Sequence, residues 1–283
     1  MALLLMNMLR GEPDEWRSHF EAAFPGMDIR FWPDLGAPED IEYLIFGRPE
    51  LDKLPPLPGL KLMLTMLAGV ERLIGSPILP DVPLVRAEPA GGDPMMNEYA
   101  VSLALYHHRN FQTYRAQQAE HVWKAAPSVA TEERRIGVMG YGILSSPVVE
   151  ALAGLNFDMA VWTRSPRENA PVQVFHGPDG LKPFLARTDI CICMLPLTPE
   201  TRGILNAQAF ADLPQGGAVI NLGRGGHMVT EDLIAALDSG HLAAASTDVT
   251  EPEPLPADSP LWDHPKVQIL PHVARRPSVA LTA

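Results

Sequence analysis

The chain is 283 residues long, enough for about two domains that bury their cores without disulfides or metals. Its composition is 46% hydrophobic and 20% charged, close to the average of globular proteins. Acidic residues outnumber basic residues by 34 to 22, the formal net charge is −12, and no basic stretch is long enough to follow a phosphate backbone, so nucleic acid is not an expected partner.

Hydropathy and cysteine usage indicate the compartment. No window approaches the ~18 uncharged apolar residues that a membrane span needs, and the first residues lack the basic region and cleavage site of a signal peptide. Cys191 and Cys193 lie two apart in an apolar run, where a strand would place them on one face as buried free thiols. We therefore expect a cytoplasmic protein that makes no membrane contact.

The first 90 residues alternate short apolar runs with turn-rich or amphipathic stretches such as 13–24. Strands that alternate with helices are typical of a parallel sheet. We expect the strands at 2–8, 27–32, 41–46 and 61–67. Residues that break regular structure cluster at 89–94, and the apolar spacing that follows predicts one long helix over 95–123 beyond a domain boundary.

A second alternating series follows a polar link at 127–135. The clearest helix is at 230–239, where Thr230 is suited to cap the helix and Gly240 to close it. This pattern predicts a doubly wound parallel sheet. The expected strands are 135–139, 158–164, 172–175, 189–195, 218–222, 243–249 and 267–270.

Gly140 and Gly142 directly follow the first strand of this series, and Ser145 stands where a G-x-G-x-x-G sequence has its third glycine. In a dinucleotide-binding loop the first glycine permits the tight turn, and the second lets the backbone approach the pyrophosphate at a helix N-terminus. Ser145 is small enough to keep helix and strand close. The segment predicts a dinucleotide site, whereas a glycine turn without a ligand is the alternative.

The end of the next strand indicates which dinucleotide is preferred. An acidic residue there would hydrogen-bond the ribose 2′-OH of NAD, but the sequence has Arg164, Ser165 and Arg167, which offer charge and donors to a 2′-phosphate. We expect NADP(H) to be preferred, with NAD(H) possible. Two solvated surface arginines are the alternative interpretation.

Three further motifs each follow a strand of the second series, at the sheet edge where such folds bind ligands. They are NLGRGG at 221–226, DVTEPEPL at 248–255 and LPHVA at 270–274. Together with the glycine loop and LPLTPETRGIL at 195–205, they resemble the D-isomer-specific 2-hydroxyacid dehydrogenases. The segments LAGV at 67–70, MNEYAV at 96–101 and SPLWDHP at 259–265 look most similar to the glyoxylate/hydroxypyruvate reductase branch.

The resemblance implies two Rossmann-like or flavodoxin-like α/β domains with the active site in the cleft between them. These are a substrate domain at 1–92, to which 272–283 returns, and a dinucleotide-binding domain at 93–271. The family continues beyond the position of Ala283, eleven residues after His272, through a helix. A homodimer through the cofactor domain and its long helix is also implied.

The resemblance also implies the roles of individual residues. Arg224, Glu253 and His272 match the catalytic arginine, acid and histidine, and Glu253 precedes the Pro-Leu that follows the acid, whereas Glu251 is interpreted as a solvated neighbour. Further positions implied are Ile143 and Leu144 at the pyrophosphate, Leu195, Pro196 and Thr201 near the adenosine half, Gly223 at the cofactor, Asp248 at the nicotinamide amide, and the backbone of Ala68, Gly69 and Val70 at the substrate carboxylate.

The chemistry of 2-keto acid reduction needs these residue types. Hydride transfer to C2 leaves negative charge on the oxygen, and a histidine beside a carboxylate can supply the proton. The guanidinium of Arg224 matches a carboxylate and stabilises the oxyanion, so no metal is expected. No partner can be named for the other histidines, among them His107 and His227, which we assign to the surface or to packing.

We therefore expect reduction of a small anionic 2-keto acid, glyoxylate or hydroxypyruvate, to the D-2-hydroxy acid. One alternative is a dehydrogenase for a larger keto acid, which depends on the space near Phe46, Leu67 and Trp262. Another is a protein on the same scaffold that senses the dinucleotide without catalysis.

Overall fold

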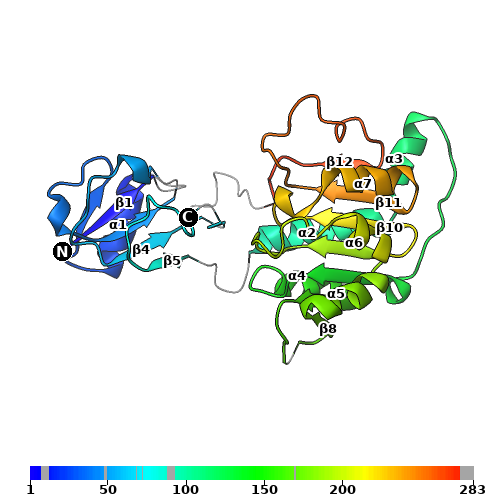
Figure 1. Ribbon diagram of the computed structural model, residues 1–283, viewed down its shortest axis with the longest axis horizontal. Helices are drawn as coiled ribbons and strands as arrows, with labels where there is room; N and C mark the ends of the chain where they lie inside the picture. The colour runs from blue at the N-terminus through cyan, green and yellow to red at the C-terminus, as the bar shows by residue number, and fades with distance from the viewer. Residues whose placement is uncertain are drawn as a thin grey trace. The chain divides into compact units, whose positions relative to one another are not determined.

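The computed structural model describes residues 1–7, 13–47, 50–67, 69–71, 73–87, 93–168 and 170–274. The chain divides after Pro89 into two compact units. Each unit has its own parallel sheet (Figure 1).

The first unit contains a five-stranded sheet in the order β2-β1-β3-β4-β5. Strand β1 is buried along its whole length, as expected for the centre of a parallel sheet that is covered on both faces. Leu4 and Met6 belong to the core on one face, whereas Leu3 and Leu5 pack on the other with Phe20 of helix α1. The elements are β1 (Ala2–Met6), α1 (Pro13–Ala23), β2 (Asp28–Phe31), η1 (Pro38–Asp40), β3 (Ile41–Phe46), η2 (Leu51–Lys53), β4 (Leu62–Thr65) and β5 (Leu84–Arg86).

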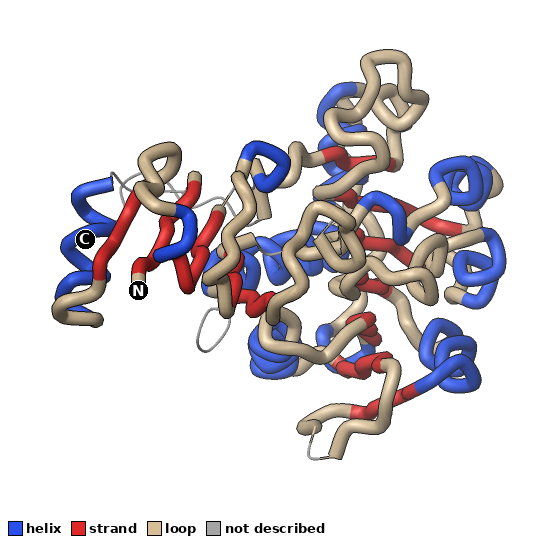
Figure 2. The backbone as a smooth tube through the Cα atoms, turned by 60° about the vertical axis from the view of Figure 1, so that its left-hand side comes forward, coloured by secondary structure: helices blue, strands red, loops and turns tan. Residues whose placement is uncertain are grey.

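The second unit contains a seven-stranded sheet in the order β12-β11-β10-β9-β6-β7-β8. Helices lie on both faces of this sheet (Figure 2). The elements are α2 (Pro94–His108), α3 (Phe111–Ala119), η3 (Thr131–Glu133), β6 (Arg135–Met139), α4 (Ser146–Gly154), β7 (Asp158–Thr163), β8 (Gln173–His176), α5 (Gly177–Ala186), β9 (Ile190–Cys193), α6 (Ala207–Asp212), β10 (Gly217–Asn221), η4 (Gly225–His227), α7 (Thr230–Asp238), β11 (Leu242–Thr247) and β12 (Val267–Ile269).

The strand order of the second sheet reverses direction between β6 and β9. From β6 the chain builds outward through β7 to β8, then returns to the other side of β6 and builds through β9 to β12. In open α/β sheets, ligands bind at the carboxyl ends of the strands beside such a reversal. The expected doubly wound α/β fold class is confirmed.

Side chains of alternate residues fill the cores on the two faces. On β9, Ile190 and Ile192 pack with α2 and α4, whereas Cys191 and Cys193 pack on the opposite face among residues of α5, α6 and α7. Both cysteines are buried free thiols, as predicted. Burial raises the pKa of the Cys193 thiol to about 12, so it stays protonated and inert.

The single long helix expected over 95–123 is wrong, because the chain forms two helices, α2 and α3. Asn110 adopts the left-handed conformation with φ 56° and ends the run, a conformation that asparagine tolerates better than most residues. Its side-chain amide donates to the carbonyl of Pro127 at 2.9 Å. The burial differs as well, since α2 buries a face that includes Met96 and Leu103, whereas no residue of α3 is buried.

One further local prediction is wrong, and one strand was not predicted. Thr230 is the first residue of α7 and does not cap it, since Val229 occupies the N-cap position and no side chain caps the helix there. Asp232 instead uses its carboxylate to accept the N–H of Ala207, the first residue of α6, at 2.8 Å. Strand β5 was not expected, because it is three residues long and two of them are exposed.

Candidate functional site

The glycine loop, Arg224, Asp248 and His272 follow the carboxyl ends of β6, β10, β11 and β12 in that order. All of these strands run parallel in the second sheet, so the segments that follow them lie at the same edge. The edge also carries the reversal of strand order between β6 and β9. The second unit therefore brings the motifs singled out in the sequence to one side of one sheet.

The loop after β6 combines a tight turn with an open position beside its backbone. Gly140 has φ 102°, and a Cβ there would press on the carbonyl oxygen of Met194 at 3.2 Å. A Cβ on Gly142 would meet nothing within 4 Å, so its backbone faces open space. Buried Ser145 accepts the N–H of Gly142 at 2.9 Å through its hydroxyl, directly before α4 begins. The backbone of Gly142 is therefore accessible to a ligand directly before the N-terminus of α4.

Ile143 and Leu144 lie between this loop and α4, and Ile143 is exposed. Arg164, Ser165 and Arg167 follow β7 and are all exposed. Thr163, buried at the end of β7, donates its hydroxyl to the carbonyl of Ser165 at 2.8 Å and so fixes the start of this loop. The two guanidinium groups are therefore accessible to an anionic ligand.

The segment after β9 forms a compact turn around Thr201. Its hydroxyl donates to the carbonyl of Pro196 at 2.7 Å and accepts the N–H of Thr198 at 2.8 Å. Leu195 is buried just before the turn, and Pro196 is exposed on it. The structure thus brings Pro196 and Thr201 together although they are five residues apart.

Arg224 is the N-cap residue directly before η4, and the buried His227 ends this helix. The N–H of Arg224 donates to Nδ1 of His227 at 2.9 Å, and its guanidinium Nη1 donates to the carbonyl of Gly223 at 2.7 Å. Gly223 must be glycine, because a Cβ would lie 2.7 Å from Nδ1 of His227. His227 therefore fixes the backbone of Arg224. The sequence analysis did not predict this role. The feature of the sequence that could have indicated it is that His227 follows Arg224 by three residues.

Glu253 and His272 form a pair. Nδ1 of His272 lies 2.8 Å from Oε2 of Glu253, with 49% of the histidine side chain and 38% of the glutamate side chain exposed. The second carboxylate oxygen of Glu253 accepts the N–H of Thr250 at 3.0 Å, which orients the carboxylate. Because Nδ1 faces Glu253, Nε2 is the ring nitrogen on the other side of His272 from this carboxylate. The half-exposed pair is accessible to a small molecule.

The turn that carries Arg224 packs against the segment that carries Glu253. A Cβ on Gly225 would collide with the main chain of Thr250, whose N–H is held by Glu253. Glu251 is half-exposed and forms an ion pair with Arg202 at 2.6 Å. These contacts connect Arg224 to Glu253 through Thr250.

Asp248 is buried at the end of β11 and holds the backbone around His272. Its carboxylate accepts the N–H groups of Val273 and Ala274, each at 2.9 Å, and the hydroxyl of Tyr99 at 2.9 Å. The predicted contact of Asp248 with a nicotinamide amide would therefore add to bonds that this carboxylate already makes.

The expected substrate-carboxylate segment belongs to the first unit. Gly69 and Val70 follow the carboxyl end of β4 and are half-buried, and the carbonyl of Val70 accepts the N–H of Leu73 at 2.9 Å. Ala68 lies outside the described residues. Phe46, one of the positions thought to limit substrate size, is completely buried in the core of this unit.

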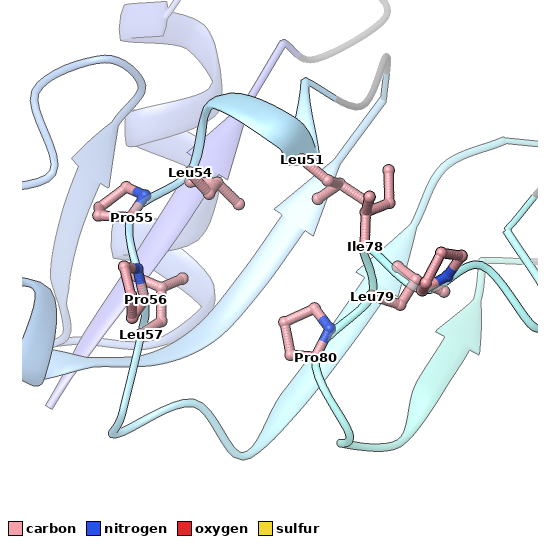
Figure 3. A pocket seen from close by; sticks show the side chains of 9 residues that line it. Leu51, Leu54, Pro55, Pro56, Leu57, Ile78, Leu79 and Pro80 are labelled. Atoms are coloured by element: carbon pink, nitrogen blue, oxygen red, sulfur yellow. The ribbon is translucent and has the colours of Figure 1, made fainter.

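The first unit also has a hollow of about 340 Å³ at its surface (Figure 3). It is lined by apolar side chains from two proline-rich segments, Leu51–Leu57 and Pro77–Pro80. The lining offers no acid, base or cation, so this hollow has no residue suited to carbonyl chemistry.

Within the ranges that the structure describes, no three histidine, cysteine or acidic side chains are grouped to hold a metal ion. A separate finding concerns membranes: none of the helices in the described part of the chain combines the length and the apolar character that a span requires.

Comparison with known proteins identifies the family. Residues 101–274 match the NAD binding domain of the D-isomer specific 2-hydroxyacid dehydrogenases. The chain belongs to this family. The resemblance seen in the sequence motifs is confirmed, and the chain is an oxidoreductase of the D-isomer specific 2-hydroxyacid dehydrogenase family.

Solved structures of family members are similar over nearly the whole chain. The D-isomer specific 2-hydroxyacid dehydrogenase of Xanthobacter autotrophicus Py2, solved with NADPH and MES, is 38% identical, with 96% of this chain and 88% of that chain covered and a TM-score of 0.85. The NADPH-dependent glyoxylate/hydroxypyruvate reductase of Sinorhizobium meliloti, solved with NADP and sulfate, is 35% identical, with coverages of 97% and 89% and a TM-score of 0.84. A probable 2-hydroxyacid dehydrogenase of Rhizobium etli CFN 42, solved with NADP, HEPES and L(+)-tartaric acid, is 32% identical, with coverages of 98% and 90% and a TM-score of 0.84.

Proposed function

We propose that this protein uses NADPH to reduce a small 2-keto acid, glyoxylate or hydroxypyruvate, to the D-2-hydroxy acid. The observation that carries the proposal is the His272–Glu253 pair at 2.8 Å, on the sheet edge that also carries the glycine loop. Similarity to the NADPH-dependent glyoxylate/hydroxypyruvate reductase of Sinorhizobium meliloti supports this choice of substrate.

His272 is the proton donor of the proposed reaction. When bound, NADPH supplies a hydride to C2 of the keto acid. Glu253 accepts a hydrogen bond from Nδ1 of His272 and orients the ring, so that Nε2 donates its proton to the carbonyl oxygen. General acid catalysis of this kind accelerates reactions by about 10²–10⁴-fold.

Arg224 neutralises the anionic substrate in this proposal. A guanidinium provides two parallel donors that match a carboxylate and a fixed positive charge for the oxyanion that forms at C2. His227 and Gly223 hold its backbone and its Nη1 in place. The backbone N–H groups of Gly69 and Val70 are proposed to bind the substrate carboxylate as well.

The cofactor is held by the loops after β6, β7 and β9. The open space beside Gly142 is proposed to hold the pyrophosphate, with Ile143 and Leu144 next to it. Arg164, Ser165 and Arg167 are proposed to bind the 2′-phosphate of NADP. Other proposed contacts are Leu195, Pro196 and Thr201 near the adenosine, and Gly223 and Asp248 at the nicotinamide end.

Steady-state kinetics with His272→Gln tests the role of His272. We expect wild-type protein to oxidise NADPH in the presence of glyoxylate or hydroxypyruvate, and the variant to lose about 10²–10⁴-fold in kcat. The dissociation constant for NADPH should stay within about twofold, because His272 faces the substrate. Near-normal turnover of the variant would exclude His272 as the general acid.

His264→Gln is the matched control. His264 also faces a carboxylate, with Nε2 3.3 Å from Oδ1 of Asp238, but it lies outside the glycine loop and the Arg224 turn. This variant should keep wild-type kinetics. Tight NADPH binding by the wild type without turnover on any 2-keto acid would contradict the proposed reaction and favour a sensing role.

We further propose that the protein is a homodimer assembled through the second unit. Helix α3 and the segment after it expose Phe111, Tyr114, Val122 and Trp123, the last with 103% exposure. That segment runs along the outside of the second unit (Figure 1). Large apolar side chains that are exposed to solvent within one short stretch of chain indicate a protein interface, and a second copy of the chain is the proposed occupant.

A further inference from the structure

Asp248 holds the backbone of the segment that carries His272. The carbonyl oxygen of Asp248 accepts the N–H of His272 at 2.8 Å. Its carboxylate oxygens then accept the next two N–H groups, Oδ1 from Val273 and Oδ2 from Ala274, each at 2.9 Å. Three successive amide groups are therefore bound by one residue, which fixes the direction in which the chain leaves β12.

The backbone of His272 needs this restraint. Its φ is 53°, in the left-handed region that residues with a Cβ rarely occupy. Such a conformation persists where the surrounding contacts enforce it, and it is found most often at functional sites. In this conformation Nδ1 of His272 reaches Glu253.

Tyr99 connects this arrangement to helix α2. Its hydroxyl donates to Oδ1 of Asp248 at 2.9 Å, the same oxygen that accepts the N–H of Val273. Asp248 is 2% exposed, so each donor to its carboxylate compensates for hydration that the group has lost. Burial and the adjacent Asp248 raise the pKa of Tyr99, which keeps the phenol protonated as a donor.

We propose that Tyr99 is a positioning residue for the reaction, acting through Asp248 on the backbone and the side-chain direction of His272. The inference rests on the proposed role of His272 as proton donor. Tyr99 itself contacts neither substrate nor the reacting atoms. Its hydroxyl completes the set of donors that hold the Asp248 carboxylate, and that carboxylate holds the chain after His272.

The test compares Tyr99→Phe with wild type, His272→Gln and the double variant. We expect Tyr99→Phe to lower kcat about tenfold with glyoxylate, since a hydrogen bond to a charged, buried group is lost. The dissociation constant for NADPH should change less than about twofold. In the His272→Gln background, the same substitution should change kcat by less than about twofold, because residues that act through one another are not additive.

Tyr106→Phe is the control, since Tyr106 lies on the same helix and its ring packs against His107 and Phe111. It should keep wild-type kcat. Hydrogen exchange gives a second readout that does not depend on activity: the peptide covering 267–274 should exchange faster in Tyr99→Phe than in wild type, and to the same extent as wild type in Tyr106→Phe.

The outcomes distinguish failure of the proposed function from failure of the positioning role of Tyr99. If His272→Gln turns over normally, the proposed function is wrong, and the inference is overturned with it. If His272→Gln is inactive but Tyr99→Phe keeps wild-type kcat, the inference alone is overturned. A tenfold loss from Tyr99→Phe that persists in the His272→Gln background would also overturn it, because Tyr99 would then act independently of His272.

Discussion

Arg164 and Arg167 are exposed on the loop that follows β7, at the place where an acidic side chain would favour NAD. The charge of Arg164 already acts on Glu200: hydrogen bonding with Thr198 and then with its own backbone, and the charge of Arg164, lower the pKa of Glu200. A 2′-phosphate with nearly two negative charges would attract the same guanidinium more strongly than one carboxylate does.

We predict that Arg164→Asp shifts the coenzyme preference toward NADH. Loss of a charged hydrogen bond worth ~1.5–3 kcal/mol should lower the ratio of kcat/KM for NADPH to that for NADH by roughly ten- to a hundredfold. Lys182→Asp, the same charge change at an exposed position of α5, controls for the overall charge of the protein. An unchanged ratio in Arg164→Asp would show that other residues bind the 2′-phosphate.

Single residues differ in how well their surroundings could be predicted. The backbone geometry at Gly140 and Gly142 could be predicted from the residue type alone, because a tight turn and open space beside the backbone both favour glycine. The contacts of His227 with Arg224 and of Tyr99 with Asp248 depend on where side chains lie after folding. Tyr99 and Asp248 are 149 residues apart in sequence, and no local pattern relates them.

Elements with a strong periodic pattern were predictable, and those whose ends depend on tertiary contacts were not. Strands β3 and β6 have the expected bounds, because each is a mostly apolar run that ends before a glycine. Helix α2 ends early since its buried face ends there and Asn110 tolerates a left-handed turn. The first turn of α7 uses Asp232 to hold α6, a contact between helices that no capping rule anticipates.

Helix α2 also contacts β11 through His107, whose Nε2 lies 2.8 Å from the hydroxyl of Ser246. That hydroxyl donates to Oε1 of Gln268 at 3.0 Å, so Nε2 of His107 is the donor to Ser246. Burial lowers the pKa of His107 to about 4. Protonation of His107 in the folded protein is therefore unfavourable at moderately acidic pH.

We predict that this histidine makes the protein less stable in mild acid. Between pH 6.5 and about 4 the unfolded chain binds a proton that the folded chain does not, so the contribution of His107 is complete above pH 6.5 and is lost as the pH falls toward 4. His107→Gln keeps a donor toward Ser246 and removes the titration. It should reduce the loss in free energy of unfolding between pH 7.5 and 4.5 by at most ~3 kcal/mol.

Denaturant unfolding at several pH values measures this difference. His176→Gln is the control, because His176 is exposed at the start of α5 in the same unit. Its pH dependence of unfolding should match that of wild type. Equal pH dependence of His107→Gln and wild type would mean that other groups govern the acid sensitivity.

The two sheets account for the different roles proposed for the two units: the second binds the cofactor and carries the proton donor, and the first binds the substrate carboxylate. The second sheet reverses its order beside the glycine loop and carries the His272–Glu253 pair at the same edge. The first sheet, in the order β2-β1-β3-β4-β5, presents Gly69 and Val70 after β4. Repeating strand-helix patterns made both sheets predictable, whereas the bounds of the connecting segments depend on contacts that composition does not encode.

The exposed apolar side chains of α3 and of the segment after it are the proposed interface of a homodimer. We predict that wild-type protein sediments as a homodimer and that Trp123→Glu weakens the dimer by about 30-fold or more, since a large aromatic side chain at the centre of an interface contributes ~2 kcal/mol or more. Sedimentation velocity over a range of concentrations measures this change. Ile74→Glu, which places the same charge at an apolar position of the first unit with 71% exposure, should leave the dimer intact. A wild-type protein that sediments as a monomer at every concentration would refute the proposed interface, and a loss of dimer in both variants would place the interface elsewhere.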